Sequence, residues 1–321
     1  MLKILYVVVP CYNEEEILNY SANILKEKIK SLTEKEIISN KSKILFIDDG
    51  STDKTWDIIV SLNKESEIFT GIKLSKNQGH QNALLAGLIT ANKIADITIS
   101  IDADLQDDTN VIDEMVDAAN AGYNIVFGVR RNRKKDSFFK KTTAELFYRI
   151  MNFLGAKTIF NHADFRLMDK TAMNALEKFK ETNLFLRGII SNLGFKTCCV
   201  YYNREIRKAG TSKYPLHKMI SFAINGITSC STKLIHIISL AGILSLFMSF
   251  LIGSYIFLSI IKGKTVSGWA SIITSIWTIG GLILISLGII GEYVGKIYME
   301  TKERPRYIIS KNLMNKENNK N

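Results

Sequence analysis

Residues 97–107 read Ile97-Thr98-Ile99-Ser100-Ile101-Asp102-Ala103-Asp104-Leu105-Gln106-Asp107. The run begins with an apolar stretch that is typical of a buried strand and then changes abruptly to acidic residues. Asp102 and Asp104 stand two positions apart, so at a strand end their side chains point the same way. Such a pair can hold a divalent cation against a diphosphate, although a lone Asp-x-Asp is more often an exposed polar turn. The surrounding sequence has to decide between a cation-binding pair and an exposed polar turn.

Short apolar runs alternate with amphipathic stretches over the first part of the chain. The expected strands are Ile4–Val9, Lys43–Ile47, Ile68–Leu74, Ile97–Ile101 and Ile125–Phe127. The expected helices, with apolar residues three and four positions apart, are Glu14–Lys30, Thr55–Lys64, His80–Thr90 and Val111–Ala121. This order predicts an α/β domain with a mostly parallel sheet covered by helices.

Polar motifs follow three of the expected strands. They are Pro10-Cys11-Tyr12-Asn13-Glu14, Asp48-Asp49-Gly50-Ser51 and the Asp102/Asp104 pair. Ligands of open parallel sheets bind beyond the carboxyl ends of the strands. We therefore expect these acidic strand ends to meet at one edge and to form the site.

The motifs exclude two common kinds of phosphate chemistry. No Gly-x-Gly-x-x-Gly follows the first strand, and there is no Gly-Lys-Ser/Thr phosphate loop. An acidic floor with basic residues downstream instead suits a metal-bridged sugar nucleotide. We expect residues 128–165 to be a mobile loop and then a helix, with basic side chains at Arg130, Arg131, Arg133, Lys134, Lys135, Lys140 and Lys141.

Two long stretches near the C-terminus lack charged side chains: Ile237–Ile261 and Trp269–Gly291. Each is long enough to cross a hydrocarbon core of roughly 30 Å as a helix. The joining segment Lys262–Gly268 is short, which predicts an antiparallel hairpin of two transmembrane helices. A hairpin of buried core helices is the alternative, but two adjacent uncharged stretches of this length are rare in soluble domains.

Positive charges flank this hairpin. Lys and Arg outnumber acids by six to one in Arg204–Lys233 and by seven to four from Glu292 onward. The positive-inside rule therefore places the N-terminal domain and the tail in the cytoplasm. The net charge of +11 fits a protein resting on anionic lipid, and no aromatic-interleaved basic motif indicates nucleic acid. We expect an interfacial amphipathic helix at residues 215–233, with a plain surface helix as the alternative, and disorder from Lys311.

The four cysteines, Cys11, Cys198, Cys199 and Cys230, include no Cys-x-x-Cys pair. They predict neither a zinc site nor a disulfide framework, so reduced thiols are expected. The N-terminal run ends in Pro10 rather than in a small-residue cleavage site, which favours a first strand over a signal peptide.

Six motifs, in this order, resemble those of family 2 inverting glycosyltransferases, and more closely the polyprenyl-phosphate glycosyltransferases related to dolichol-phosphate mannose synthase. The first three are Val8–Glu15, Ile47–Asp53 and Asp102–Asp107. The more specific ones are Ala163–Met168, Phe185–Gly188 and Arg204–Pro215, followed by the two apolar stretches and Gly291–Tyr298.

The resemblance implies a GT-A nucleotide-sugar domain that moves one hexose to undecaprenyl phosphate with inversion. UDP-glucose and UDP-N-acetylglucosamine are the favoured donors, and the lipid-linked sugar would serve cell-surface glycan modification at the bacterial inner membrane. The implied divisions are a cytoplasmic catalytic domain at 1–214, an interfacial helix at 215–233, two transmembrane helices within 234–295 and a cytoplasmic tail at 296–321.

The resemblance also implies roles for individual residues. Pro10, Tyr12, Glu14 and Asp49 would contact the nucleoside, and Asp102 would lie near the ribose or the sugar. Asp104 and Gln106 would bind Mg²⁺ or Mn²⁺. Arg130, Arg207 and Lys213 would hold phosphates, and Asp164 would face the sugar with Arg166 beside it.

Simpler interpretations stay open for several of these residues. Asp164 and Arg166 could form a structural ion pair, Arg207 and Lys213 could be surface charge, and Asp49 could cap a turn. A general-base role for Asp164 is open, since a polyprenyl phosphate is already an anion and needs no strong base.

The sequence departs from the processive polysaccharide synthases, because it lacks a Gln-x-x-Arg-Trp motif and has Phe185–Gly188 in that place. Two spans leave no room for a polymer channel, which favours transfer of one sugar. A processive synthase and a non-catalytic membrane subunit are the alternatives.

Asn192 stands where relatives often carry Trp. Small residues on the second span allow a homo-oligomer: Gly280, Gly281, Ser286 and Gly288.

Overall fold

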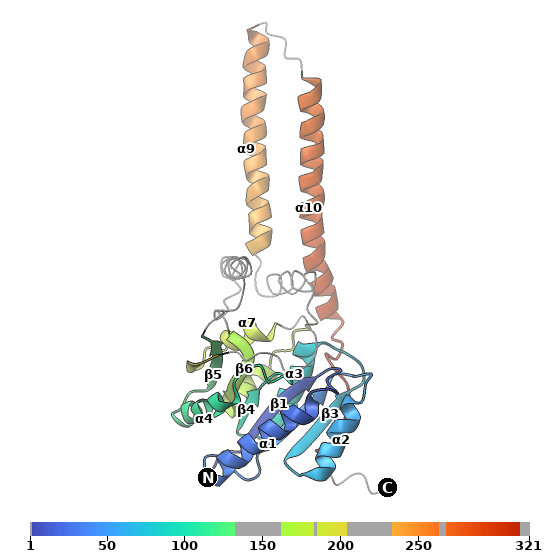
Figure 1. Cartoon of the computed structure of the whole chain (residues 1–321). Coiled ribbons are helices and arrows are strands. Elements are labelled where there is room, and N and C mark those ends of the chain that lie inside the picture. The colour runs from blue at the N-terminus through green and yellow to red at the C-terminus, as the bar shows by residue number, and fades with distance from the viewer. Residues whose placement is uncertain (1, 132–161, 183–184, 204–232, 263–267, 315–321) are drawn as a thin grey trace.

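Among the described residues, a sheet of eight strands forms the centre of an α/β domain in the computed structural model (Figure 1). The structure describes residues 2–131, 162–182, 185–203, 233–262 and 268–314. The strands are β1 (Leu5–Cys11), β2 (Lys43–Asp48), β3 (Phe69–Leu74), β4 (Ile97–Ser100), β5 (Ile125–Arg130), β6 (His162–Asp169), β7 (Thr197–Tyr202) and β8 (Ile309–Asn312).

The strand order is β7-β5-β6-β4-β1-β2-β3-β8. β1 pairs in parallel with both β2 and β4, β2 pairs in parallel with β3, and β5 pairs in parallel with β7. Only β6, between β4 and β5, and β8, beside β3, run antiparallel among the described strands. The prediction of an α/β domain with a mostly parallel sheet is confirmed.

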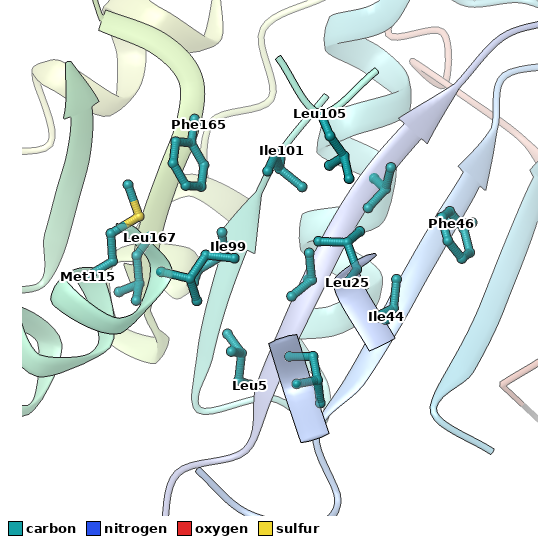
Figure 2. Close-up of a cluster of buried hydrophobic side chains, with 14 of the residues drawn as sticks. Leu5, Leu25, Ile44, Phe46, Ile99, Ile101, Leu105, Met115, Phe165 and Leu167 are labelled. Carbon is teal, nitrogen blue, oxygen red and sulfur yellow. The ribbon is translucent and has the colours of Figure 1, made fainter. Parts of the chain in front are cut away.

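Helices cover both faces of this sheet. One core holds apolar side chains of α1 (Leu18–Glu34), α2 (Thr55–Glu65) and α4 (Ile112–Asn120). Figure 2 shows Leu25 of α1 and Met115 of α4 over strand residues of this core, such as Leu5, Ile99 and Leu167. The second core lies against α3 (His80–Asn92), α6 (Lys170–Glu177) and α7 (Leu186–Ser191).

The sequence of β1 shows why its strand is buried on both faces. Successive side chains point to opposite faces, so Val7 and Val9 enter one core and Val8 enters the other. α3 lies very close to β1 and β2 at Gly87. A Cβ atom at Gly87 would stand 2.5 Å from side-chain atoms of both Val8 and Ile47.

Most predicted elements lie where the periodicity placed them, with shifted ends. α1 begins at Leu18 rather than Glu14, because Glu14 forms a turn in which its carbonyl accepts bonds from the amides of Ile17 and Leu18. β5 extends to Arg130. β6, β7 and β8 were not predicted individually.

The prediction of disorder from Lys311 onward is wrong for the first of these residues. Ile309–Asn312 forms β8 on the edge of β3, and the Leu313 amide donates to the Gly71 carbonyl at 2.9 Å. Ile309 and Met314 pack against the core under α3. The open edge of β3 and these apolar side chains therefore outweigh the polar composition of the tail.

Two long helices, α9 (Lys233–Ile261) and α10 (Trp269–Thr301), run antiparallel beside each other and project from one end of the domain (Figure 1). Within the described part of the chain, one segment, Thr278–Thr301, is long and apolar enough to cross a membrane, and none of its apolar window is buried. The expected helix at 215–233 and most of the basic region 128–165 fall outside the described residues.

Candidate active site

The three predicted polar motifs follow strands that are neighbours in the sheet. The order β4-β1-β2 places the turns after these strands side by side at the carboxyl edge. Direct bonds join the first two motifs: the Asp49 amide donates to the Cys11 carbonyl at 2.9 Å, and the Asn13 amide donates to Ser51 Oγ at 3.0 Å. Pro10 is buried beneath this edge, and Tyr12 is exposed at its rim.

Asp49 is buried and holds the loop that leads into α3. Its Oδ1 accepts from the Gln78 amide at 2.8 Å, and its Oδ2 accepts from the Gly79 amide at 2.9 Å. Burial raises the pKa of Asp49, although these two bonds oppose the shift. Asp48 caps the turn of its own motif by accepting from the Ser51 amide at 2.9 Å.

Gly50 allows the loop before α3 to approach this turn. Its φ is +67°, and a Cβ atom there would stand 2.5 Å from the backbone carbonyl carbon of Lys76. Glycine therefore meets both a conformational and a steric requirement at this position.

Asp102 and Asp104 alternate with two residues whose side chains point inward. Ala103 and Leu105 are buried in the core, while both carboxylates are partly exposed. Leu105 has a φ of +44°, and Asp104 Oδ1 accepts weakly from the Gln106 amide at 3.4 Å. The alternation of buried and partly exposed residues leaves both carboxylates accessible just after the end of β4.

The residues present fit a hard divalent cation that also binds substrate. No group of three or more His, Cys, Asp or Glu that could enclose a metal occurs within the described ranges. Mg²⁺ is commonly held by one or two carboxylates and completes its shell with phosphate oxygens and water. Asp104, with the amide oxygen of Gln106, supplies oxygen ligands of the right kind.

Asp164, on β6, is surrounded by three basic side chains. Arg187 of α7 binds it through two nitrogens, Arg166 Nη2 donates to Oδ1, and His80 Nε2 lies 3.4 Å from Oδ2. Burial alone would raise the pKa of Asp164, but Arg187, His80 and Arg166 outweigh it and hold that pKa well below its ordinary value. The carboxyl group is therefore ionised throughout the physiological range.

Arg166 is fully buried, with 0% of its surface exposed. Its Nε and Nη1 have no hydrogen-bond partner among the described residues. Burial lowers its pKa, although the nearby Asp164 opposes the shift. The ion pair with Asp164, which is the simpler interpretation of these two residues, is present.

His80, at the start of α3, links the two groups of acidic residues. Its Nε2 lies 3.7 Å from Asp102 Oδ1 as well as 3.4 Å from Asp164 Oδ2. Burial disfavours the charged imidazole, but the bond to Asp164 and the charge of Asp102 outweigh burial and raise the pKa of His80. The imidazole between the two carboxylates therefore favours their close approach when it is protonated.

Arg130 is held at the end of β5 by a second cluster. Its Nε and Nη2 donate to Asp107 Oδ1 at 3.2 and 2.9 Å, and the Tyr202 hydroxyl donates to the same oxygen at 2.6 Å. Burial and the Asp107 charge raise the pKa of Tyr202. These bonds fix the orientation of the Arg130 side chain.

Sequence reasoning missed His80, Arg187 and Tyr202 as parts of the site. Arg187 lies in a quoted motif, but its partner is 23 residues away. A histidine directly after Gly79 at the carboxyl end of β3 is a signal that could have identified His80. Arg207 and Lys213 lie outside the residues that the structure describes.

Comparison with known proteins finds similar proteins that are named as glycosyltransferases. The family described as Glycosyl transferase family 2 matches residues 6–176. An uncharacterized glycosyltransferase, YkoT, of Bacillus subtilis (strain 168) is 51% identical over 314 residues, covering 98% of this chain and 93% of that protein. A bactoprenol glucosyl transferase of Shigella phage SfX is 37% identical over 305 residues, covering 94% of this chain and 97% of that protein.

A solved structure, glucosyl-3-phosphoglycerate synthase from Mycobacterium tuberculosis, is similar over 71% of this chain and 80% of its own. The TM-score is 0.48 and the identity is 16%, which is too distant a likeness to bear on substrates.

Proposed function

The chain belongs to glycosyl transferase family 2, and from this premise we propose that it transfers one glucose from a nucleotide diphosphate sugar to a polyprenyl phosphate, with inversion. The observation that carries the proposal is the 37% identity to a bactoprenol glucosyl transferase over nearly the whole of both chains. That span includes the apolar C-terminal helices as well as the site. UDP-glucose is the donor we favour, and UDP-N-acetylglucosamine is the alternative donor.

The membrane arrangement forms part of the same proposal. α9 and α10 would cross the bilayer as a hairpin, and the domain before them and the tail after them would lie in the cytoplasm at the bacterial inner membrane. The length and apolar surface of the two helices support this, as does the excess of Lys and Arg on both flanks. A lipid phosphate would then reach the sheet edge from the end at which the helices project.

The donor would bind over the three acidic turns. Tyr12 is exposed for contact with the base, and Pro10, Glu14 and Asp49 shape the turn beneath it. Asp102 would accept bonds from ribose or sugar hydroxyls, and Arg130 would hold a phosphate.

A divalent cation, Mg²⁺ or Mn²⁺, would be held by Asp104 and Gln106. When bound, it would neutralise the diphosphate and stabilise the charge of the leaving group. Arg207 and Lys213 are the candidates for additional phosphate contacts.

An oxygen of the acceptor phosphate would attack the anomeric carbon directly. Both oxygens of Asp164 are occupied by basic partners, so this carboxylate would not remove a proton. It would keep Arg187 and His80 in place, and catalysis would rest on orientation and on charge stabilisation.

Membranes that contain the protein test the proposal. They would be incubated with undecaprenyl phosphate, Mg²⁺ and one radiolabelled donor at a time: UDP-glucose, UDP-N-acetylglucosamine, UDP-galactose or GDP-mannose. We expect chloroform-extractable label from UDP-glucose alone, abolished by EDTA, in a lipid that carries one sugar with inverted anomeric configuration.

Other results would contradict the proposal in different ways. Label in a long polymer would favour a processive synthase. A folded protein that gives no label with any donor, or membranes that keep full activity with the Asp104→Ala variant, would favour a non-catalytic membrane subunit.

A further inference from the structure

The end of α10 is attached to the catalytic domain beside the active site. α10 continues beyond its apolar part to Thr301, and Pro305 follows shortly after, where a helix cannot continue. The chain then passes Arg306 and enters β8. Residues 300–306 therefore connect a long apolar helix to the edge of the sheet.

Two charged side chains of this connection bind one segment of the domain. Both oxygens of Glu300 accept from the Thr182 amide, at 2.7 and 2.9 Å. Arg306 Nη1 donates to the Phe179 carbonyl at 2.7 Å. Each bond joins an ionised group to the backbone, which makes it stronger than a bond between neutral groups.

The segment held in this way leads directly into α7. Thr182 comes shortly before Leu186, whose amide donates to Gln81 Oε1 at 2.8 Å. The next residue, Arg187, makes the bidentate contact with Asp164. Glu300 is thus linked through one short stretch of chain to a side chain of the candidate active site.

The connection is fixed at its far end as well. The Ser75 amide donates to the Ile308 carbonyl at 2.9 Å, and β8 continues the sheet beside β3. Tyr307 packs against the core under α3. A segment that is anchored at both ends transmits the position of α10 to the domain.

We propose that residues 300–306 form a strap that sets the active site at a fixed distance from the lipid surface, with Glu300 and Arg306 as positioning residues for a lipid-borne acceptor. This inference rests on the proposed function, because it concerns the acceptor of that reaction. The donor site, at the carboxyl ends of β1, β2 and β4, lies on other elements and does not require the strap. An acceptor that diffuses in water would not require it either.

Full-length Glu300→Ala and Arg306→Ala variants in proteoliposomes test the strap. We expect transfer from UDP-glucose to undecaprenyl phosphate to fall about tenfold, because a small displacement of reacting groups is costly. Transfer in detergent to geranyl phosphate, a short prenyl phosphate, and the Kd for UDP-glucose should stay within about twofold of wild type. Glu300→Gln keeps an acceptor oxygen and should restore much of the lost transfer.

Two neighbouring residues provide matched controls. Glu303 and Arg304 carry the same charges and are exposed on the same stretch. Glu303→Ala and Arg304→Ala should leave transfer to both acceptors unchanged. The strap proposal would be overturned if Glu300→Ala and Arg306→Ala lost transfer to both acceptors equally, or if the two controls showed the same selective loss.

Hydrogen exchange tests the contact without any substrate. The peptide that spans Phe179–Thr182 should exchange faster in Glu300→Ala than in Glu303→Ala. Unchanged exchange would overturn the strap. If the wild type labels neither acceptor, the proposed function fails, and exchange alone then decides whether the strap exists.

Discussion

Arg187 of α7 binds both carboxylate oxygens of Asp164 on β6, with Nε 3.1 Å from Oδ1 and Nη2 3.0 Å from Oδ2. The pair joins a helix on one face of the sheet to the antiparallel strand between β4 and β5. Two further cations, Arg166 and His80, converge on the same carboxylate. Asp164 is therefore the common partner of three basic side chains, and in the proposed function it holds them in place rather than removing a proton.

Arg187→Lys should reduce kcat with the lipid acceptor by about tenfold or more, because lysine cannot form the two parallel bonds. The comparison is with Lys196→Arg, a basic exchange at an exposed residue of the same half of the domain. Steady-state kinetics would be measured with both substrates varied. A kcat within twofold of wild type would mean that the bidentate geometry is unimportant.

Asp164→Asn should destabilise the protein by about 3 kcal/mol near pH 7, because it leaves buried Arg166 without its counter-charge. The folded-state pKa of Asp164 is depressed, so its ionised form stabilises the fold above the unfolded value of about 3.9. That contribution is lost as the pH falls through the folded pKa, below about pH 4.

The difference in thermal stability between wild type and Asp164→Asn should therefore be constant from pH 7 to about pH 5 and narrow below about pH 4. Thermal unfolding of the full chain in detergent measures it. Asp113→Asn, which removes a partly exposed pair with Lys28, is the control and should cost about 1 kcal/mol or less. A difference that stays constant down to pH 2 would show that Asp164 has an ordinary pKa.

His80→Ala should lower kcat/KM for the donor by about tenfold, because Asp102 and Asp164 then face each other without the imidazole between them. Asn82→Ala changes the same turn of α3, where its side chain bonds only the Gln78 carbonyl among the contacts described, and should have a small effect. Similar losses in both variants would indicate a general disturbance of the helix end instead.

The sheet could be predicted because the sequence signals of its strands lie within short, continuous stretches of the chain. Apolar runs such as Lys43–Ile47 and the acidic residues that end them fix the strands of a parallel sheet, and their carboxyl ends must then meet. The Asp102 and Asp104 pair could be proposed as part of a site only because two further polar motifs end neighbouring strands. Its inward neighbours, Ala103 and Leu105, are the apolar residues that the spacing requires.

The cation cluster could not be predicted in this way. His80, Asp164 and Arg187 come from three elements that are far apart in the sequence, and no periodicity relates them. β8 was missed for a different reason: its strand depends on an open edge of β3, which a polar tail sequence does not reveal. Both the cluster and β8 depend on contacts between residues far apart in the sequence rather than on local propensity.

Gly50→Ala should lower the stability of the fold more than a glycine replacement elsewhere, because Gly50 meets two requirements: a positive φ and a close approach of neighbouring backbone. Its positive φ alone costs about 1 kcal/mol in alanine. A methyl group would also press on the Lys76 backbone at 2.5 Å and displace the loop whose amides bind Asp49. Gly122 is the matched control, since its φ is +88° but nothing lies within 4 Å of a Cβ there. Thermal unfolding should show a larger loss for Gly50→Ala than for Gly122→Ala, and only Gly50→Ala should weaken UDP-glucose binding. Equal losses in the two variants, with donor binding intact, would show that the close approach of the loop does not support the donor site.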